Sequence, residues 1–446
     1  MPLYFSLAEL NKILQHNLVQ TVNDSPDLSV LAITTDTRQI PTQALFIALK
    51  GENFDGHDFT PQAVEGGAIA VIVNRQIKSL TVPQFIVKDT LQAYQQIARW
   101  WRDRFDIPVI GVTGSVGKTS TKELIAAVLG TQGKVLKTEG NFNNEIGVPK
   151  TLLQITSEHN YAVIEMAMRG RGEIALLAEI ARPTIGIITN VGTAHIGRLG
   201  SREAIAQAKC ELLTHMPQTS TAVLNYDNPL LIETANQVWQ GKTITYGLTG
   251  GNVCGKINGN NITVADKSLP LPLPGEHNAS NYLGAIAIAQ ELKIDFTPLI
   301  AGLQVQLPKG RSRRYDLPND IVILDETYNA GLESMLAALQ MLKETPGTRH
   351  IAVLGTMKEL GEHAPQLHYQ VGEQAQKLNL DLLMVLADEA ATEEIIKGAT
   401  GITTEYFSDR TTLINKLKQI MRSGDRILCK ASNSVGLNQV VEALTE

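Results

Sequence analysis

The chain has 446 residues, of which 43% are hydrophobic and 19% are charged, and its formal net charge at pH 7 is −6. This composition is typical of folded globular domains and excludes a largely disordered chain. The negative net charge argues against a general binder of nucleic acids or membrane surfaces, although a small anionic substrate could still bind at local basic groups. At roughly 150 residues per domain, the length predicts about three domains.

The three cysteines, Cys210, Cys254 and Cys429, lie far apart and form no C-x-x-C pair. We therefore expect neither a disulfide framework nor a zinc site, and we expect a reduced, cytoplasmic setting. The N-terminal stretch lacks basic residues followed by an apolar core, so no signal peptide is expected. No apolar run approaches the ~20 residues that cross a bilayer.

The first part of the chain, residues 1–98, alternates short β-like runs with helical segments. Four runs rich in apolar and β-branched residues predict strands. They cover residues 31–36, 44–51, 68–74 and 84–89. Residues 90–105 have a helical pattern and lead out of this unit, which we interpret as a small α/β domain.

A second βα series begins at Ile107 and predicts a central domain, residues 99–309. Residues 107–114 are apolar on both faces, as in a buried parallel strand, and the helix that follows places Leu124, Ile125, Val128 and Leu129 on one face. Further strands with helical segments between them predict a parallel sheet. They cover residues 161–167, 184–192 and 221–227. Residues 241–274, rich in Gly, Asn and Pro, predict a hairpin-like excursion, and residues 278–292 predict a helix.

A third βα series predicts a Rossmann-like C-terminal domain, residues 310–446. It follows the segment 307–314, LPKGRSRR, which is a candidate hinge. Its predicted strands cover residues 321–329, 350–357, 381–388 and 426–432. The sequence thus predicts an α/β protein of three domains, with a P-loop-type parallel sheet in the central one.

The segment TGSVGKTS, residues 113–120, lies between a predicted strand and a predicted helix. The strict pattern G-x-x-x-x-G-K-[ST] would place its first glycine at Val112, so this loop is a variant. Its physical basis is intact, because glycines let the backbone approach an anion and a helix N-terminus favours negative charge. Lys118 is expected to reach the β- and γ-phosphates, and the Thr119 hydroxyl to bind Mg²⁺. The alternative is a Gly-rich turn with a surface lysine.

Two further residues follow or end apolar runs and could complete this centre. Glu165 ends the run in AVIEMA, and His195 follows the strand predicted at 184–192. Both would project at the carboxyl edge of the sheet, where α/β folds bind ligands. A carboxylate that ends a buried strand is costly unless it is paired or binds a cation, whereas a lone histidine in a loop is usually structural. From composition alone, Lys209 is an ordinary helix lysine.

Together these segments resemble the Mur ligase family, which comprises cytoplasmic ATP-dependent amide-forming enzymes of peptidoglycan synthesis. The resemblance is carried by residues 113–120, 138–153, 162–174, 189–201 and 208–213, and it extends over essentially the whole chain. Within the family, four other segments resemble most the branch that joins D-alanyl-D-alanine to UDP-N-acetylmuramoyl-tripeptide. These are residues 34–59, 275–281, 325–335 and 354–364.

The resemblance implies roles for individual residues. Thr119, Glu165 and His195 fall where the family binds magnesium. Lys209 falls where the family carries a carbamylated lysine, whose CO₂ adduct acts as a carboxylate-like metal ligand, and this replaces the composition-based interpretation. Arg311 matches a phosphate-contacting arginine and joins Lys118, Glu165, His195 and Lys209 in the expected catalytic set. The expected nucleotide-binding residues are Thr113, Gly114, Ser115, Val116, Gly117, Lys118, Thr119, Asn278, Asn281, Arg311, Glu326, Tyr328 and Asn329. The residues expected to meet the UDP-sugar substrate are Thr35, Asp36, Thr37, Arg38, Lys50, Gly51, Asp55, Gly56, His57, Asn141, Asn143 and Asn144.

At two places the sequence departs from the family pattern. Glu326, in DETYNAG, replaces the second of two aspartates, and Asn433, in KASNSVG, stands where an arginine is expected, although Lys430 is retained. A longer carboxylate and a missing guanidinium imply that contacts to the dipeptide or the acyl phosphate are arranged differently.

The implied activity uses ATP and Mg²⁺. The carboxylate of the UDP-N-acetylmuramoyl-tripeptide attacks the γ-phosphate, and D-alanyl-D-alanine then displaces phosphate from the acyl phosphate. ATP would bind to the central domain, the sugar nucleotide to the first and the dipeptide chiefly to the third, with closure about 307–314. We expect a monomer, with no nucleic-acid partner and no membrane insertion.

Several alternatives stay open at this point. A sister ligase that adds a diamino acid usually carries a D-N-P-R stretch, and none occurs here. A polyglutamate-type ligase of folate metabolism shares the loop but should lack the UDP-binding segment. A GTPase should show N-K-x-D, which is absent. A regulatory P-loop ATPase and a non-catalytic UDP-sugar-binding protein are the remaining alternatives.

Overall fold

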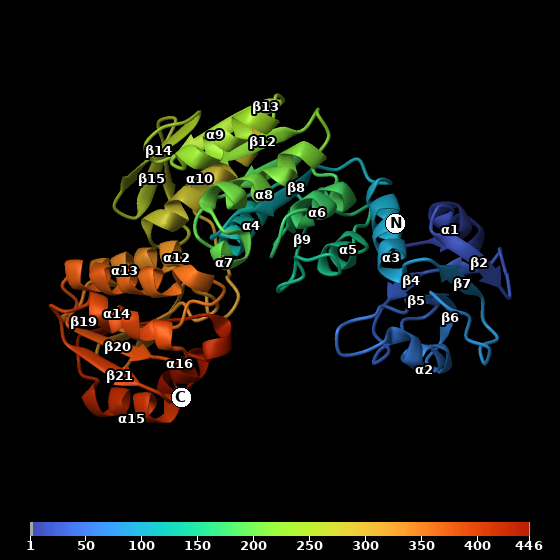
Figure 1. Ribbon diagram of the computed structural model, residues 1–446. Coiled ribbons are helices and arrows are strands. Elements are labelled where there is room, and N and C mark those ends of the chain that lie inside the picture. Colours follow the sequence, from blue (N-terminus) through green and yellow to red (C-terminus); the bar gives the residue numbers. More distant parts are fainter. Residues whose placement is uncertain (1–2, 446) are drawn as a thin grey trace.

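The computed structural model describes residues 3–445. Its strands form three large sheets that follow one another along the chain, and a two-stranded pair, β1–β3, accompanies the first sheet. We call the parts built around the large sheets the N-terminal lobe (3–89), the central lobe (104–309) and the C-terminal lobe (310–445). The lobes form an arc, with the central lobe between the other two (Figure 1). The α/β class expected from the sequence is confirmed.

The N-terminal lobe has a five-stranded sheet in the order β2-β7-β6-β5-β4, parallel except for β2. Its elements are β1 (Phe5–Ser6), α1 (Leu7–Leu14), β2 (Leu18–Val22), β3 (Ser29–Val30), β4 (Ala32–Thr34), β5 (Ala44–Ile47), η1 (Gly56–Phe59), α2 (Thr60–Glu65), β6 (Ala68–Val73) and β7 (Gln84–Val87). All four predicted strands are present. The sequence did not predict β2, because this edge strand is only partly buried and lacks an apolar pattern.

Helix α3 (Thr90–Arg102) joins the N-terminal lobe to the central lobe. It begins at an N-cap, Asp89, whose carboxylate accepts the N–H groups of Leu91 and Gln92. At its other end the buried Arg102 guanidinium donates to three backbone carbonyls, those of Phe105, Ala181 and Arg182. The domain boundary predicted at 98/99 therefore falls inside one continuous helix.

The central lobe has a nine-stranded sheet in the order β16-β15-β14-β13-β12-β11-β8-β10-β9. Its strands are β8 (Val109–Thr113), β9 (Val135–Lys137), β10 (Tyr161–Glu165), β11 (Ile185–Ile188), β12 (Thr221–Asn225), β13 (Lys242–Gly247), β14 (Val253–Asn258), β15 (Asn261–Val264) and β16 (Lys267–Pro270). Its helices are α4 (Lys118–Leu129), α5 (Gly147–Leu152), α6 (Glu173–Ala181), α7 (Ile196–Leu199), α8 (Arg202–His215), α9 (Pro229–Val238), α10 (Glu276–Glu291) and α11 (Thr297–Ile300).

The segment 241–274 is not a separate hairpin, so that prediction was incomplete. Strand β13 pairs in parallel with β12, and β14 continues the sheet by a short parallel pairing before β15 and β16 turn back antiparallel. The apolar side chains of this segment, such as Tyr246 and Ile262, are buried in the same core as helices α4 and α10. Burial against two helices explains why the segment extends the sheet.

The C-terminal lobe has a six-stranded sheet in the order β17-β18-β22-β19-β20-β21, parallel except for β17. Its elements are β17 (Arg313–Leu317), β18 (Ile321–Asp325), α12 (Leu332–Glu344), β19 (Arg349–Gly355), η2 (Gly361–His363), α13 (Ala364–Lys377), β20 (Leu382–Leu386), η3 (Ala390–Glu393), α14 (Glu394–Gly398), β21 (Thr404–Phe407), α15 (Arg410–Ile420), β22 (Asp425–Lys430), η4 (Asn433–Val435) and α16 (Asn438–Thr445). The edge strands β17 and β21 were not predicted; β17 takes up the end of the candidate hinge.

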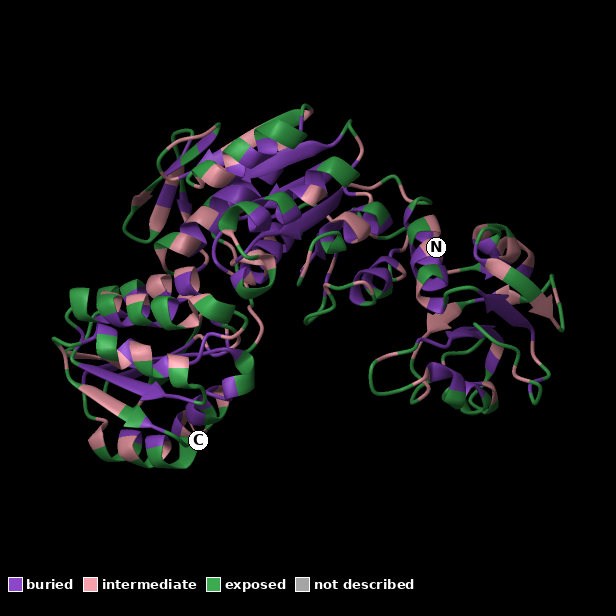
Figure 2. Cartoon of the chain, in the orientation of Figure 1, coloured by how far each residue is buried: buried purple, intermediate pink, exposed green. Residues whose placement is uncertain are grey.

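Burial follows this architecture closely. The inner strands of the central and C-terminal sheets are buried, whereas edge strands such as β17 and the outer faces of the flanking helices are exposed (Figure 2). Because β8, β10, β11 and β12 are parallel, the loops that follow them leave the same edge of the sheet. Within the described residues, no helix has both the length and the apolar composition that a membrane crossing requires.

Candidate functional site

The phosphate-binding loop lies between β8 and α4, as the sequence predicted. Val112, at the position of the absent first Walker glycine, is a fully buried strand residue. Gly114 and Gly117 have positive φ angles of 153° and 81°, which glycine adopts at little cost. A Cβ on Gly114 would lie 1.9 Å from Thr189 Oγ1, so the loop packs directly on the end of β11.

Asn190 holds this loop from the side. Its backbone carbonyl accepts the N–H of Ser115, and its side-chain oxygen accepts the N–H of Val116 at 3.0 Å. These two N–H groups are therefore already engaged. The groups left to meet an anion are the N–H groups of the first turn of α4, which no helix can satisfy internally.

Glu165 lies against the start of α4. Its Oε2 accepts the Thr119 hydroxyl at 3.0 Å, and its Oε1 accepts the Asn143 amide at 2.8 Å. The ammonium of the buried Lys122 lies 3.8 Å from the same carboxylate. Glu165 is only 2% exposed, so these contacts supply the pairing that a buried carboxylate requires.

Lys118 lies between Glu165 and two other candidate residues. Its Nζ donates to the carbonyls of Gly114 and Ser115 at 2.8 and 3.3 Å. Burial lowers the pKa of Lys118, and the negative charge of Glu165 opposes this shift. The charge of Lys118 in turn lowers the pKa of His195 and of Lys209, so both residues lie within reach of its electrostatic field.

His195 is held in a left-handed backbone conformation, with φ at 65°, just before α7. Its Nδ1 lies 2.6 Å from Glu359 Oε2, in the loop between β19 and η2 of the C-terminal lobe. Burial lowers the pKa of His195, the charge of Lys118 lowers it further, and Glu359 opposes the shift without reversing it. The imidazole is therefore neutral at pH 7, which is the form that binds metals.

Lys209 lies on α8 and is 1% exposed. Burial and the neighbouring Lys118 lower its pKa well below the ordinary value. Among residues 3–445 its amine has no hydrogen-bonding partner and no carboxylate within ion-pair distance. The composition-based interpretation of Lys209 as an ordinary helix lysine is therefore wrong, because the side chain of such a lysine would reach solvent.

A cavity of about 390 Å³ lies where the central and C-terminal lobes meet. The phosphate loop lines one side of it, and residues 310–312, just before β17, and the segment between β18 and α12 line the other. The predicted nucleotide-binding residues that line it are Ser115, Val116, Gly117, Lys118, Thr119, Asn281, Arg311, Glu326, Tyr328 and Asn329. Thr113, Gly114 and Asn278 support this lining from behind, and Glu165, His195 and Lys209 also lie outside it.

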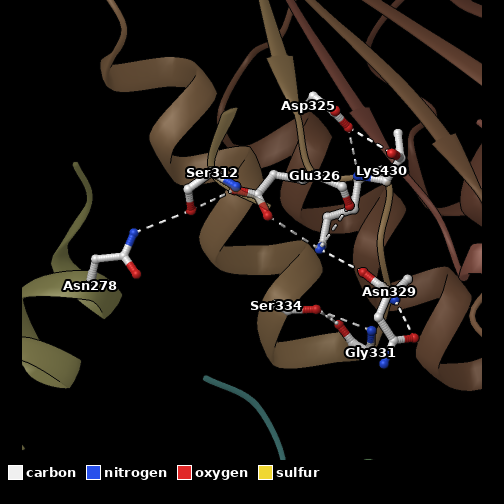
Figure 3. Close-up of polar contacts among 10 residues, drawn as sticks. Asn278, Ser312, Asp325, Glu326, Asn329, Gly331, Ser334 and Lys430 are labelled. Carbon is white, nitrogen blue, oxygen red and sulfur yellow. Dashed lines mark hydrogen bonds and ion pairs between the residues drawn. The ribbon is translucent and has the colours of Figure 1, made fainter. Parts of the chain in front are cut away.

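A chain of polar contacts crosses the seam between the two lobes (Figure 3). Asn278 of α10 donates to Pro274 O at 2.7 Å and lies 3.4 Å from the Ser312 hydroxyl. Ser312 in turn donates its N–H and its hydroxyl to Glu326 Oε1, both at 3.0 Å. The buried Lys430 donates to Asn329 O at 2.9 Å and lies 4.0 Å from Glu326 Oε2. The longer side chain of Glu326 thus finds partners in Ser312 and Lys430.

Arg311 points a guanidinium group into the same cavity. Its Cζ lies 3.9 Å from the centre of the Tyr328 ring, and its buried Nε has no partner among the described residues. A cation stacked on an aromatic ring with a free donor is suited to an anionic ligand. Asn433, by contrast, does not line this cavity; it lines a second cavity of about 350 Å³ with Lys309 and Arg313.

The first group of predicted substrate residues, Thr35 to Arg38, forms an exposed loop of the N-terminal lobe. Arg38 donates two charged hydrogen bonds to Asp36 and lowers the pKa of that carboxyl to about 2. The charge of Lys150, on α5 of the central lobe, acts in the same direction.

The second group, in the segment 50–57, is largely occupied with its own structure. His57 is buried; its Nδ1 lies 2.5 Å from Asp55, and its Nε2 accepts the N–H of Asn74 at 2.9 Å. Lys50 pairs with Asp55 through a β-bridge, while Gly51 and Gly56 bond to Phe54 and Leu49. His57 has no ring nitrogen left for a substrate, which corrects that expectation.

The three asparagines between β9 and α5 have different roles. Asn143 contacts Glu165, so it lies at the phosphate-loop centre. Asn144 is exposed, and its Oδ1 accepts the N–H groups of Ile146 and Gly147 just before α5, so its contact with a substrate stays a prediction. Asn141 is exposed, and its carbonyl accepts the N–H of Asn143.

Sequence reasoning missed several residues of this region. Asn190 and Glu359 occur in motifs that were recognised, and Lys122 lies in the helix predicted after the loop, but their side chains were not singled out. Glu333, at the start of α12, accepts the N–H and the hydroxyl of Thr193 at 2.7 and 3.1 Å across the seam. Lys122 could have been noticed from the sequence, because it is a lysine inside the apolar helix pattern that follows the loop. The contacts between the lobes could not have been found in this way.

Three family models match the chain. The Mur ligase middle domain matches residues 112–289, the Mur ligase glutamate ligase domain matches residues 310–433, and the Mur ligase family catalytic domain matches residues 29–102. A curated relative from Synechocystis sp., a UDP-N-acetylmuramoyl-tripeptide–D-alanyl-D-alanine ligase, is 59% identical over 98% of this chain and 97% of its own length.

Solved structures show the same relationship. MurF from Acinetobacter baumannii is 30% identical, with a TM-score of 0.90 over 100% of this chain and 99% of its own. MurF from Thermotoga maritima, solved in complex with ADP, is 29% identical, with a TM-score of 0.84 over 93% of this chain and 97% of its own. The family models, the whole-length identity and the shared fold agree, and the chain belongs to the Mur ligase family.

Proposed function

We propose that the chain is an ATP-dependent ligase that joins D-alanyl-D-alanine to UDP-N-acetylmuramoyl-tripeptide through an acyl phosphate. The observation that carries the proposal is the seam cavity, where the phosphate loop and Lys118 of one lobe face Arg311 of the other. The whole-length similarity to the Synechocystis ligase supports the choice of substrates. In this proposal the protein works in the cytoplasm as a monomer.

Magnesium fits the residues at the phosphate loop. Mg²⁺ is usually held by one or two carboxylates together with substrate phosphates, rather than by a complete cage of protein ligands. The Thr119 hydroxyl and the Glu165 carboxylate, 3.0 Å apart, form such a partial set. The absence of a cluster of three His, Cys, Asp or Glu side chains from residues 3–445 is compatible with this mode of binding. When bound, Mg²⁺ would neutralise phosphate charge.

We propose that Lys209 is carbamylated in the active protein. A buried neutral amine without a carboxylate partner is a reactive nucleophile. Its nitrogen would bond to the carbon of CO₂ and release a proton to water, which leaves a negatively charged carbamate beside Lys118 and His195. The product is a carboxylate-like group on the side of the phosphate loop where His195 lies. Thr119, Glu165, His195 and modified Lys209 would then be the metal-binding set.

The chain's own residues assist the reaction by charge. A peptide carboxylate must approach a triphosphate, and the repulsion between unit charges 4 Å apart is about 4 kcal/mol at an effective dielectric of 20. Lys118, the N–H groups of the first turn of α4 and Arg311 offset this repulsion where charge develops. The carboxylate oxygen bonds to the γ-phosphorus and ADP leaves; the dipeptide amine then bonds to the acyl carbon, loses a proton, and phosphate leaves.

The three lobes divide the binding of substrates in this proposal. The central lobe holds ATP with Asn278 and Asn281, the C-terminal lobe supplies Glu326, Tyr328, Asn329 and the dipeptide site, and the N-terminal lobe receives the UDP group through the loop 35–38. The proposed boundaries are 1–98, 99–309 and 310–446. The first boundary lies within α3, whose residues Ala93 and Ile97 belong to the core of the N-terminal lobe while Arg102 anchors its end to the central lobe.

Phosphate release measured with ATP, Mg²⁺, the UDP-muramoyl tripeptide and a panel of amines tests the function. We expect turnover with D-alanyl-D-alanine and none with a free diamino acid. Turnover of the UDP-dipeptide with a diamino acid would identify the sister ligase instead. ATP hydrolysis that is indifferent to both substrates would identify a P-loop ATPase and remove the proposal.

A further inference from the structure

The loop that carries His195 is held from the C-terminal lobe at two points. Glu333 accepts the N–H and the hydroxyl of Thr193, and Glu359 contacts His195 itself. The packing is also close at this place, since a Cβ on Gly192 would lie 2.5 Å from the Glu333 carboxyl carbon. The first part of the loop 190–197 is held by side chains of its own lobe, since Ser115 accepts the N–H of Gly192 and Asn228 donates to the carbonyl of Val191. Thr193 and His195 are contacted by side chains of the C-terminal lobe.

Glu359 makes three separate contacts with this loop and its helix. Its Oε2 lies 2.6 Å from His195 Nδ1, its Oε1 lies 3.2 Å from the Arg198 guanidinium, and its backbone carbonyl accepts the N–H of Gly197 at 3.2 Å. Glu359 itself has a φ of 64°, a conformation that L-residues rarely adopt. Two facing residues, His195 and Glu359, are thus both held in left-handed conformations at one contact.

Glu359 Oε2 lies at ion-pair distance from His195 Nδ1, which is buried and has no partner of hydrogen-bond geometry among the described residues, so the contact acts by charge. A carboxylate beside Nδ1 favours the tautomer with the proton on Nδ1, which leaves Nε2 unprotonated. The pair is only partly exposed, so the interaction is not simply a solvated surface pair. A carboxylate that orients a histidine in this way is known to raise the affinity of the other nitrogen for a metal.

We infer that Glu359 is a positioning residue for His195, which it orients with Nε2 free only when the C-terminal lobe is seated on the central lobe. This inference rests on the proposed ligase function and adds to it. The docking of the C-terminal lobe, which brings Arg311 and Glu326 to the cavity, would also order His195 on one side of the catalytic centre. Water-exposed ATP in an open molecule would then meet an incompletely ordered centre, which limits wasteful hydrolysis.

The test uses Glu359→Ala and the conservative Glu359→Gln in the full chain, with two matched controls. Arg198→Gln removes the ion pair that Glu359 makes through its other carboxylate oxygen. Glu362→Gln changes an exposed neighbouring carboxylate on η2. We expect kcat for the ligase reaction to fall about 10- to 100-fold in Glu359→Ala and less in Glu359→Gln, with the KM for ATP within about threefold of wild type. Both controls should keep kcat within about twofold.

A second readout does not depend on activity. In nitrogen-15 NMR spectra of the protein without nucleotide, the two-bond couplings of the His195 ring should report a proton on Nδ1 in wild type and a mixture of tautomers in Glu359→Ala. A wild-type kcat and tautomer in Glu359→Ala would overturn the inference, as would an equal loss of kcat in Arg198→Gln. If wild type itself shows no turnover dependent on D-alanyl-D-alanine, the proposed function fails, and the tautomer comparison still tests Glu359.

Discussion

Lys209 is a cationic side chain in surroundings that disfavour a positive charge. It is enclosed, lies near the charge of Lys118 and has no carboxylate partner among the described residues. Deep burial of an unpaired ammonium is costly, so such a group either loses its proton or is modified. Loss of the proton is the first step toward the proposed modification, because only the neutral amine can react with CO₂.

Replacing Lys209 by Ala should reduce ligase activity on the order of 100-fold, because the modified side chain would be a metal ligand. Added short carboxylates such as formate or acetate should restore part of the activity by occupying the space that the side chain leaves. The measurement is phosphate release with and without each carboxylate. Full activity in Lys209→Ala, or a loss that no carboxylate restores, would show that this lysine has only a structural role.

His368 shows how burial of a residue makes stability depend on pH. Its ring is fully buried; Nε2 accepts the N–H of Met357 at 2.9 Å and Nδ1 lies 2.7 Å from Ala364 O, so the imidazole is neutral. Burial lowers its pKa below the ordinary 6.5. The unfolded chain therefore binds this proton more readily than the folded one.

The free energy of unfolding should consequently fall as pH drops from 6.5 toward the lowered pKa of His368, and this term should be absent above pH 6.5. One imidazole contributes at most about 1.4 kcal/mol per pH unit. Urea unfolding of the C-terminal lobe at pH 7.5, 6.5 and 5.5 measures how its free energy of unfolding changes with pH. His368→Gln should be less stable at pH 7.5 but should lose this part of the pH dependence; an unchanged slope would contradict the prediction.

Residue types alone did not determine partners. His57 and Asn144 matched the family's substrate segments, yet the structure uses both of them to organise their own loops. Glu326, by contrast, could be placed near the nucleotide from its motif, but its partner Ser312 could not. A motif gives the position of a side chain along the chain, whereas a hydrogen bond depends on which other segment lies opposite.

At the scale of elements, the phosphate loop and its flanking strand and helix form one unit. The order strand, glycine loop, helix was predictable because β8 is apolar on both faces and α4 has an apolar face at helical spacing. The edge strands β2 and β17 were not predictable. Their residues are exposed or charged, and an edge strand is recognised by its neighbour rather than by its own pattern.

Gly114→Ala should disrupt the loop as a unit. The new methyl group would collide with Thr189 Oγ1, and alanine tolerates a φ of 153° poorly, at a cost of about 1–3 kcal/mol. The KM for ATP should rise about tenfold or more, since 1.4 kcal/mol corresponds to a factor of ten. Gly170→Ala is the matched control, because its nearest neighbour would lie 3.6 Å away. Equal KM values in the two variants would refute the packing argument.

At the scale of the whole molecule, the N-terminal lobe stands apart from the C-terminal lobe across the arc of the three lobes (Figure 1). The central and C-terminal lobes are already connected by Glu333, Glu359 and the chain from Asn278 to Glu326. The N-terminal lobe is connected chiefly through α3. Movement of the N-terminal lobe is therefore the expected motion when a substrate bridges the lobes.

Small-angle X-ray scattering should detect this motion. The radius of gyration should decrease when the UDP-muramoyl tripeptide and a non-hydrolysable ATP analogue are added together, because the peptide must then connect the loop 35–38 to the phosphate loop. The ATP analogue alone should change it less, since the lobes around the nucleotide cavity are already in contact. An unchanged radius of gyration with both ligands would show that the substrate spans the gap without closure.

The sequence by itself determined the α/β class, the three βα series, the phosphate loop and the order of the candidate residues, because apolar periodicity and glycine-rich turns depend on neighbours along the chain. Only the tertiary structure decided that Asn190 occupies two loop N–H groups, that Lys209 is buried beside Lys118, and that Glu359 contacts His195 from another lobe. These facts depend on distances between segments up to 164 residues apart, from Glu359 to His195, and no local pattern encodes such distances. The chemistry at the seam is therefore a property of the assembled lobes.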